Sequence, residues 1–387
     1  MDFQVSPEQE AIRQQVRRVC AGFPDDYWLG KDQRHEFPEE FYQAVAAGGW
    51  LGIAMPEAHG GAGLGISEAC LVVQEAAAAG ATAAASSIHM NIFGVNPLVK
   101  HGSPEQLQAH LPGIIQGRTK VCFGVTEPDA GLDTTRLKTR AVREGDHYRV
   151  SGRKIWISTA QHAHKILLLA RTTPREECQR PTDGLSLFFT DLDRRAVDVR
   201  EIAKTGRHAV DSNELFIDGL RVPVGDRVGE EGRGFQYILD GLNPERILIA
   251  AEAIGIGRAV LERAVRYAKE RVVFGRPIGQ NQAIQHPLAQ CWANLEAADL
   301  LTCKAAWLYD QGRPCGAEAN AAKLLAAEHA FIAADRAMQT LGGMGYAQEF
   351  HVERFWREAK LFRIAPVTPE LILSYIAEKV LGLPKSY

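Results

Sequence analysis

The spacing of apolar residues changes twice along the chain, and this change constrains the fold more than any other feature. In the N-terminal part (1–117) apolar side chains recur at helical spacing, and Ser6 and Gln9 form the capping box of a first helix. Short β-branched and aromatic runs separated by turn residues follow (118–230). The last part (231–387) is again helical. We therefore predict an α+β protein with a helical domain, a small all-β domain and a bundle of long helices, in that order.

The individual elements follow from the same patterns. The β part contains five runs that predict strands, and the C-terminal part contains three long amphipathic stretches. The predicted strands are 120–125, 147–150, 165–170, 185–189 and 214–217, and the predicted long helices are 246–273, 283–311 and 317–340.

Composition excludes several classes of protein. The formal net charge of the 387 residues is -3, so no general attraction to nucleic acid is expected. The seven cysteines never form a C-x-x-C pair, which indicates reduced thiols rather than a disulfide framework or a metal site. The start lacks the pattern of a signal or transit peptide, and the most apolar stretch (66–88) is interrupted by acidic residues. We expect a soluble, cytoplasmic protein without a membrane span.

Two segments of the β part have the character of a binding site. After the strand at 120–125, a turn that contains Thr126 leaves backbone N–H groups and a hydroxyl free for the edge of a flat polar heterocycle, although an ordinary strand-end turn has the same composition. In the second segment, Trp156 and Ser158 lie on one face of a strand, because side chains alternate with period two. Such a tryptophan is either part of the core or one wall of a flavin site.

In this order, and before a helical bundle, these segments resemble the acyl-CoA dehydrogenase family, and the resemblance covers nearly the whole chain. Seven segments match the family in the family's order, with Leu215 where many members have valine. They are the opening MDF-x-x-S-x-E-Q, Pro56-Glu-Ala-His-Gly-Gly61, Thr126-Glu-Pro-Asp-Ala-Gly131, Lys154-Ile-Trp-Ile-Ser158, Leu215-Phe-Ile-Asp-Gly-Leu-Arg-Val-Pro223, Arg271-Val-Val-Phe-Gly275 through Gln282, and Gln339-Thr-Leu-Gly-Gly-Met-Gly345.

The resemblance implies a β-barrel-like middle domain, a C-terminal four-helix bundle and an FAD cofactor. It assigns residues to the cofactor in two groups. Phe123, Val125, Thr126, Trp156 and Ser158 match positions around the flavin ring, and Thr368 matches a position near the adenine. Arg271, Phe274, Gln282, Gln339 and Gly343 match positions that reach the FAD of a neighbouring subunit.

Two residues of the second group also have simpler explanations. Arg271 falls in the last turn of a helix that would end near Gly275, where any cation complements the helix dipole. The glycine run 342–345 could be only a helix terminator. Without the family resemblance, these explanations would be preferred.

The family's catalytic base is where this sequence departs from most members. They carry a glutamate late in the chain, but the matching residue here is Pro366, which has neither a carboxylate nor an N–H. A minority of members, resembling the isovaleryl-CoA and long-chain enzymes, carry the base on a bundle helix, and Glu245 matches that position. We predict Glu245 as the base and leave Glu370 and Glu252 as alternatives.

The neighbours of Glu245 permit a purely structural explanation. Asn243 is a good N-cap and Pro244 suits the first helical position, so an acidic residue next would serve the helix dipole, which lowers its pKa. An acyl chain packed against Glu245 would raise that pKa instead. The resemblance also assigns Asn243, Arg246 and Leu132 to the substrate, and Leu132 replaces a serine of many members.

The function implied by the resemblance is α,β-oxidation of an acyl-CoA thioester in fatty acid metabolism, with electrons passed to an electron-transfer flavoprotein and a homotetramer as the assembly. Two alternatives use the same fold. One is a flavin-dependent oxidase or monooxygenase, and the other is a non-catalytic flavin-binding scaffold.

Overall fold

The computed structural model describes residues 5–386, so the Met1-Asp-Phe3 opening of the family motif lies outside the described residues. The predicted capping box is confirmed, because the Ser6 hydroxyl accepts the Gln9 N–H at 3.2 Å and the Gln9 side chain accepts the Ser6 N–H at 3.3 Å. The helices of the N-terminal part are α1 (Pro7–Cys20), α2 (Asp25–Arg34), α3 (Glu39–Ala47), α4 (Ile66–Ala78), α5 (Thr82–Phe93), α6 (Asn96–His101) and α7 (Pro104–Ile115).

The middle part of the chain forms one sheet of eight strands, in the order β6-β7-β3-β2-β4-β5-β8, with β1 parallel to β4. All five predicted strands are present, and three short strands escaped prediction because their sequences are mostly polar. The strands are β1 (Val121–Gly124), β2 (Arg140–Glu144), β3 (His147–Ser158), β4 (Lys165–Arg171), β5 (Leu185–Asp191), β6 (Val197–Glu201), β7 (Ser212–Pro223) and β8 (Arg227–Val228).

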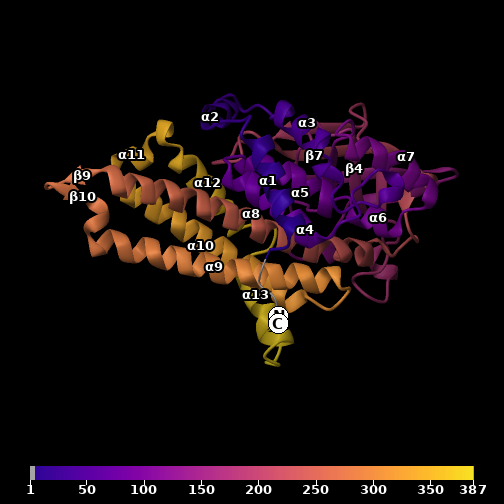
Figure 1. Ribbon diagram of the computed structural model, residues 1–387. Coiled ribbons are helices and arrows are strands. Elements are labelled where there is room, and N and C mark those ends of the chain that lie inside the picture. Colours follow the sequence, from indigo (N-terminus) through magenta and orange to yellow (C-terminus); the bar gives the residue numbers. More distant parts are fainter. Residues whose placement is uncertain (1–4, 387) are drawn as a thin grey trace.

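The central strand β4 is buried on both faces. Ile166 and Leu168 belong to a core built from the sheet's own residues, whereas Leu167 and Leu169 pack in a second core with residues of α6 and α7 such as Leu98. Figure 1 shows α6 and α7 beside this part of the sheet. The sheet is thus held against the N-terminal helices on one face and covers its own core on the other.

The C-terminal part is built on three long helices that run side by side, α8 (Gly234–Glu270), α9 (Gln282–Asp310) and α10 (Gly316–Leu341) (Figure 1). Helix α8 has 37 residues, which corresponds to a length of roughly 55 Å. A two-stranded hairpin lies at its far end. The remaining elements are β9 (Val272–Val273), β10 (Arg276–Pro277), α11 (Gly343–Tyr346), α12 (Val352–Phe362) and α13 (Pro369–Lys379).

The predicted start of the first long helix was wrong. The helix begins at Gly234 and continues through Pro244, so Asn243 is not its N-cap. The reason is packing at the true start, where Gly234 lies so close to the β5 backbone that a Cβ would stand 2.5 Å from the Leu187 nitrogen. Apolar residues of the first turns, such as Ile238, are buried against the sheet. This tertiary contact outweighs the single hydrogen bond that a proline removes.

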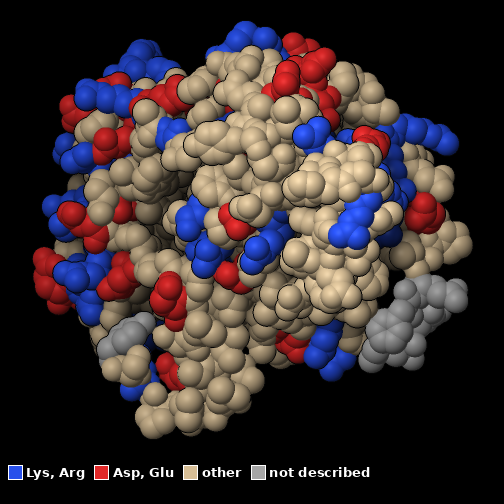
Figure 2. Space-filling view, turned by 90° about the vertical axis from the view of Figure 1, so that its left-hand side faces the viewer, with Lys and Arg blue, Asp and Glu red and all other residues tan. Residues whose placement is uncertain are grey.

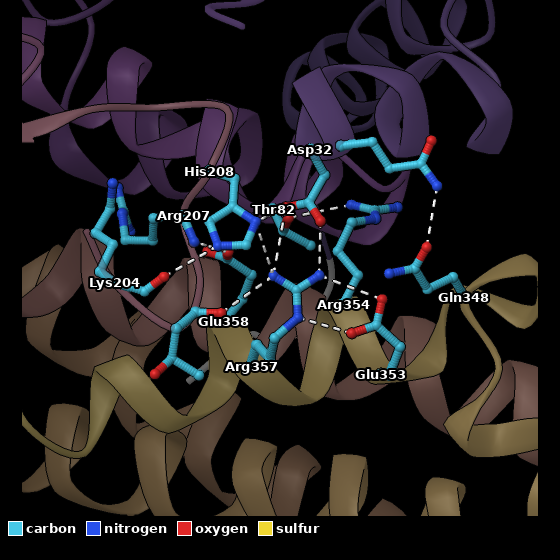
Figure 3. A network of polar contacts seen from close by, with 12 residues as sticks. Asp32, Thr82, Lys204, Arg207, His208, Gln348, Glu353, Arg354, Arg357 and Glu358 are labelled. Carbon is cyan, nitrogen blue, oxygen red and sulfur yellow. Dashed lines mark hydrogen bonds and ion pairs between the residues drawn. The ribbon is translucent and has the colours of Figure 1, made fainter. Parts of the chain in front are cut away.

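A polar network joins the three parts of the chain (Figure 3). Arg357 of α12 donates to Asp32 of α2 at 2.6 Å and to Glu353 at 2.7 Å. Glu358, the next residue of α12, accepts the backbone N–H of Arg207 from the loop between β6 and β7. Because these groups are mostly buried and come from all three parts, they fix the parts relative to one another.

Among the described residues, no helix is long and apolar enough to cross a membrane. All seven cysteines are free thiols.

Candidate active site

The turn after β1 is held by a buried carboxylate. Glu127 accepts the backbone N–H groups of Lys138 at 2.7 Å and Thr139 at 2.9 Å, and the Lys154 ammonium at 2.9 Å. Lys154 also donates to the Val125 carbonyl at 3.0 Å. Burial lowers the pKa of Lys154 to about 8, while Glu127 opposes this shift. Burial alone would raise the pKa of Glu127, but Lys154 and the hydrogen bonds keep it below its usual value.

Sequence reasoning gave no role to Glu127 and Lys154, although both lie inside the motifs. The available signal was Lys154 itself, because an ionisable side chain at a core-facing strand position needs a buried partner. The pair fixes the turn that precedes β2 to the middle of β3.

The alternation argument for Trp156 and Ser158 holds only in part. The β3–β7 register shifts between Lys154 and Ile157, and Trp156 has a left-handed φ of 61°, so the strand is not regular there. Ile157 is nevertheless buried between them, whereas Ser158 is partly accessible and the Trp156 side chain is 56% exposed. A large exposed aromatic side chain on strained backbone is typical of a functional site.

The two motif segments lie side by side. The Ile155 N–H donates to the Thr126 carbonyl at 3.0 Å, which places the turn after β1 beside Trp156. Thr159 directly follows β3, and its hydroxyl is buried without a hydrogen-bond partner among the described residues. An exposed indole, the hydroxyls of Thr126 and Ser158 and an unsatisfied donor suit a flat ring with a polar edge, so these residues fit a flavin. Phe123 lies in β1 and Val125 directly follows the strand, so both lie next to Thr126 in the chain.

The second predicted group lies at the other end of the molecule. Arg271 follows the last residue of α8 and makes no side-chain contact to a partner in the described chain, and the Phe274 side chain is fully exposed. Gln282 begins α9, and Gln339 and Gly343 flank the end of α10. Figure 2 looks onto this end, where charged side chains of both signs surround neutral ones. The chain therefore does not bring the two groups together.

The simpler explanations for this second group are partly wrong. Helix α8 ends at Glu270 rather than near Gly275, because the backbone becomes extended at Arg271 (ψ 113°) and continues into β9. The positive φ values of Phe274 and Gly275 belong to the tight turn between β9 and β10. Arg271 is the C-cap residue and not part of the last turn. Gly342, with φ of 60°, does end α10.

Glu245 lies within α8, about three turns after its start, so the helix dipole does not govern its charge. Burial raises the pKa of the Glu245 carboxyl to about 7, while the cations Arg246 and Lys323 oppose the shift. A carboxyl with a pKa near neutral pH is suited to act as a general base.

Lys323 links Glu245 to the position that most family members use for the base. It is fully buried on α10 and donates to the Val367 carbonyl at 2.7 Å, directly after Pro366. Burial and the nearby Arg246 lower the pKa of Lys323 to about 8, and Glu245 raises it. The Lys323 ammonium thus contacts the segment that carries Pro366 and is also close enough to Glu245 for each group to shift the pKa of the other.

The other two candidate bases differ from Glu245. Glu370 is exposed at the start of α13, where hydrogen bonds to its own backbone and to Thr368 lower its pKa. Thr368 itself is the N-cap of α13, with its hydroxyl accepting the Leu371 N–H at 3.3 Å. Glu252 is completely buried and hydrogen-bonded to His89 at 2.8 Å. Of the three, Glu245 alone is partly accessible, and burial raises its pKa to about 7.

A pocket of about 710 Å³ opens beside this part of α8. Asn243 and Arg246 line one wall, with Asn320 of α10 and Tyr375 of α13 opposite. Arg246 donates to Asn243 at 3.4 Å, and its Nε is buried without a partner. A buried guanidinium with a free donor is suited to bind a polar ligand group. Leu132 is exposed in the loop after β1 and does not line this pocket.

Comparison with known proteins gives a consistent result over the whole length. Residues 6–118, 122–220 and 232–381 match the N-terminal, middle and C-terminal domains of the acyl-CoA dehydrogenase family. The acyl-CoA dehydrogenase FadE12 of Mycobacterium tuberculosis is 38% identical over 394 residues, covering 100% of this chain and 99% of that protein.

Two solved structures show the same fold. A glutaryl-coenzyme A dehydrogenase in complex with glutaryl-CoA is 31% identical, with a TM-score of 0.95 over 100% of this chain and 98% of the other. The prolyl acyl carrier protein oxidase AnaB is 27% identical, with a TM-score of 0.92 over 98% of this chain and 100% of the other. The predicted fold and the flavin cofactor are in agreement with these relatives.

Proposed function

The chain belongs to the acyl-CoA dehydrogenase family as an FAD-dependent oxidoreductase, and we propose that it oxidises the acyl group of a CoA thioester to the enoyl thioester. The observation that carries this proposal is Glu245. It is a partly accessible carboxyl with a pKa of about 7, and the next residue of α8, Arg246, lines a pocket that Glu245 itself does not line.

In the proposed reaction, the Glu245 carboxylate takes a proton from the carbon next to the thioester carbonyl. The neighbouring carbon loses hydrogen with its electron pair, and a double bond forms between the two carbons. FAD, when bound at the indole face of Trp156, supplies the acceptor for that hydride. The chain's own residues then have three tasks. Glu245 removes and holds the proton, Arg246 and Asn243 position the thioester, and the turn fixed by Glu127 aligns the ring.

Pro366 supports the assignment of the base to α8. Because it cannot provide a carboxylate or an N–H, the segment after α12 can neither remove the proton nor donate to the thioester oxygen from this residue. Lys323 donates to the Val367 carbonyl directly after Pro366 and also lies near Glu245. Glu245 can therefore serve, from α8, the substrate atoms that most family members reach from the position of Pro366.

We infer further that the active assembly is a homotetramer, arranged as a dimer of dimers. Two observations support this. The second cofactor group lies at the far end of α8, where only another subunit could use it. One face of α9 also exposes Trp292, Leu300 and Trp307, which are 51–60% exposed and seven or eight residues apart. Light scattering of the flavin-loaded protein tests this assembly, and a flavin-loaded monomer would contradict it.

The function is tested by mixing the purified yellow protein anaerobically with CoA thioesters of varied length and branching. We expect at least one to bleach the flavin absorbance, and reoxidation to need an electron-transfer flavoprotein rather than oxygen. If no thioester bleaches the flavin, the proposal is wrong. Bleaching followed by rapid oxygen consumption would instead assign the chain to the oxidases of this fold.

A further inference from the structure

A buried histidine–glutamate pair joins α5 to α8 and has no part in the chemistry described above. Nδ1 of His89 and Oε2 of Glu252 are 2.8 Å apart, and the side chains are 6% and 0% exposed. The other carboxyl oxygen of Glu252, Oε1, is buried without a hydrogen-bond partner in the described part of the chain. Leaving such an oxygen unsatisfied is costly, so a donor that reaches it would be bound firmly.

Glu252 shares a face of α8 with the proposed base. Gly241, Glu245 and Glu252 follow one another at intervals of four and seven residues, which places them along one stripe. Glu252 therefore lies roughly 10 Å beyond Glu245 along the helix axis.

Helix α5 runs along this stripe in the opposite direction. Phe93, at its end, packs so close to Gly241 that a Cβ there would lie 3.1 Å from the Phe93 carbonyl oxygen, while His89, one turn earlier, meets Glu252. Glu245 lies between these two contacts of α8 with α5.

Aromatic rings connect the pair to the flavin group. The Phe93 ring lies 5.5 Å from the ring of Phe123 and 5.3 Å from that of His89, measured between centroids. Phe123 lies in β1, three residues before Thr126 of the proposed flavin group. The base, the flavin group and the buried pair therefore border one region between α5, α8 and β1.

We propose that the His89–Glu252 pair recognises a hydroxyl group toward the far end of the substrate's acyl chain. This proposal rests on the proposed function, because it takes the reacting carbons to lie at Glu245. An acyl chain that extends from Glu245 along α8 meets Glu252 after roughly 10 Å, where a hydroxyl can donate to the free Oε1. A plain alkyl end leaves Oε1 unsatisfied, and a carboxylate end would put two acidic groups together.

The test uses paired CoA thioethers, which lack the carbonyl and so cannot be oxidised. S-hexyl-, S-octyl- and S-decyl-CoA are each compared with their ω-hydroxy counterpart by calorimetric titration of the FAD-loaded protein. For at least one length we expect the hydroxylated ligand to bind about tenfold tighter, as one additional hydrogen bond to an otherwise unsatisfied buried oxygen implies. Equal or weaker binding of the hydroxy ligand at every length would overturn the inference.

Two variants assign the preference to the pair. Glu252→Gln keeps the shape of the side chain, and the double variant His89→Phe with Glu252→Leu replaces both partners by apolar groups, which avoids an orphaned polar atom. Both should lose the preference while plain alkyl ligands still bind. A preference that survives in the double variant would overturn the assignment. If no thioether of either kind binds to the wild-type protein, the proposed function itself fails, and the inference fails with it.

Discussion

The two groups of residues predicted to hold FAD differ in how the chain supports them. The first group, around Thr126 and Trp156, lies on neighbouring strands and is fixed by the buried Glu127–Lys154 pair. The second, around Arg271 and Phe274, is exposed at the end of α8 and has no side-chain partner in the described chain. On the proposed assembly, the first group holds the cofactor within one subunit, and the second group serves the cofactor of another copy.

We therefore expect the first group to matter for the folding of a subunit and the second group to matter for the assembly of subunits. A buried ion pair with three further hydrogen bonds is part of the folded core, so damage to it should unfold the middle domain. An exposed arginine at a hairpin contributes little to stability alone, so damage to it should appear only when cofactor and subunits come together. Glu245 lies on the helix that connects the two groups.

Lys154→Met should have the largest effect, because it leaves the Glu127 carboxylate buried without its cation. We expect a loss of about 3 kcal/mol or more in the free energy of unfolding, measured in urea, together with loss of bound FAD. Lys138→Met is the matched control, because the exposed Lys138–Asp129 pair should contribute less than about 1 kcal/mol. Similar effects of the two variants would remove the distinction between a buried and an exposed pair.

Arg271→Ala should leave the unfolding of the isolated subunit unchanged within about 0.5 kcal/mol. FAD should dissociate about 10 to 100 times more readily from the assembled protein, because a charge-assisted contact to the pyrophosphate is lost. Fluorescence of released flavin measures this, with Arg195→Ala, at an exposed site of the middle domain, as the control.

Assemblies that contain two different variants test whether the two groups act on one cofactor from different subunits. Subunits with Trp156→Ala and subunits with Arg271→Ala should each bind FAD poorly. When they are unfolded and refolded together, some sites combine an intact Trp156 from one subunit with an intact Arg271 from another, and FAD binding should return in part. No recovery would mean that both groups belong to a site within one chain.

Lys323→Met should have a smaller effect than Lys154→Met or Arg271→Ala. Its ammonium opposes the rise in the pKa of Glu245, so its removal raises that pKa further above about 7. A base must be deprotonated to work, so the rate of flavin reduction rises as pH passes upward through the Glu245 pKa. We expect this limb of the pH profile to move to higher pH by roughly one unit. A shift to lower pH would show that Lys323 does not act on Glu245.

The order of the three parts and the main strands could be predicted from apolar spacing, and the motifs singled out two segments that lie side by side in the structure. Errors arose where contacts distant in the sequence decide the structure. Helix α8 starts before Asn243 because Gly234 packs on β5, and no local signal outweighs Asn243 and Pro244 as helix-start residues. The left-handed Trp156 breaks the expected alternation where the β3–β7 register shifts.

The charges of the site residues also depend on contacts that are distant in the sequence. Glu245 remains the predicted base, but the helix-start interpretation predicted a lowered pKa for its carboxyl, whereas burial raises it. The buried partners Lys154, Lys323 and His89 had no assigned role, because each pairs with a residue that is distant in the sequence.

The most direct test of the account is rapid anaerobic mixing of Glu245→Gln with a thioester that bleaches the wild-type flavin. Glutamine has the shape of glutamate but cannot take the proton, so the rate of bleaching should fall by a factor of about 10³ while FAD and the thioester still bind. Glu370→Gln, at an exposed carboxyl, should bleach at the wild-type rate. If Glu245→Gln bleaches as fast as the wild type, Glu245 is not the base and the proposed mechanism is wrong.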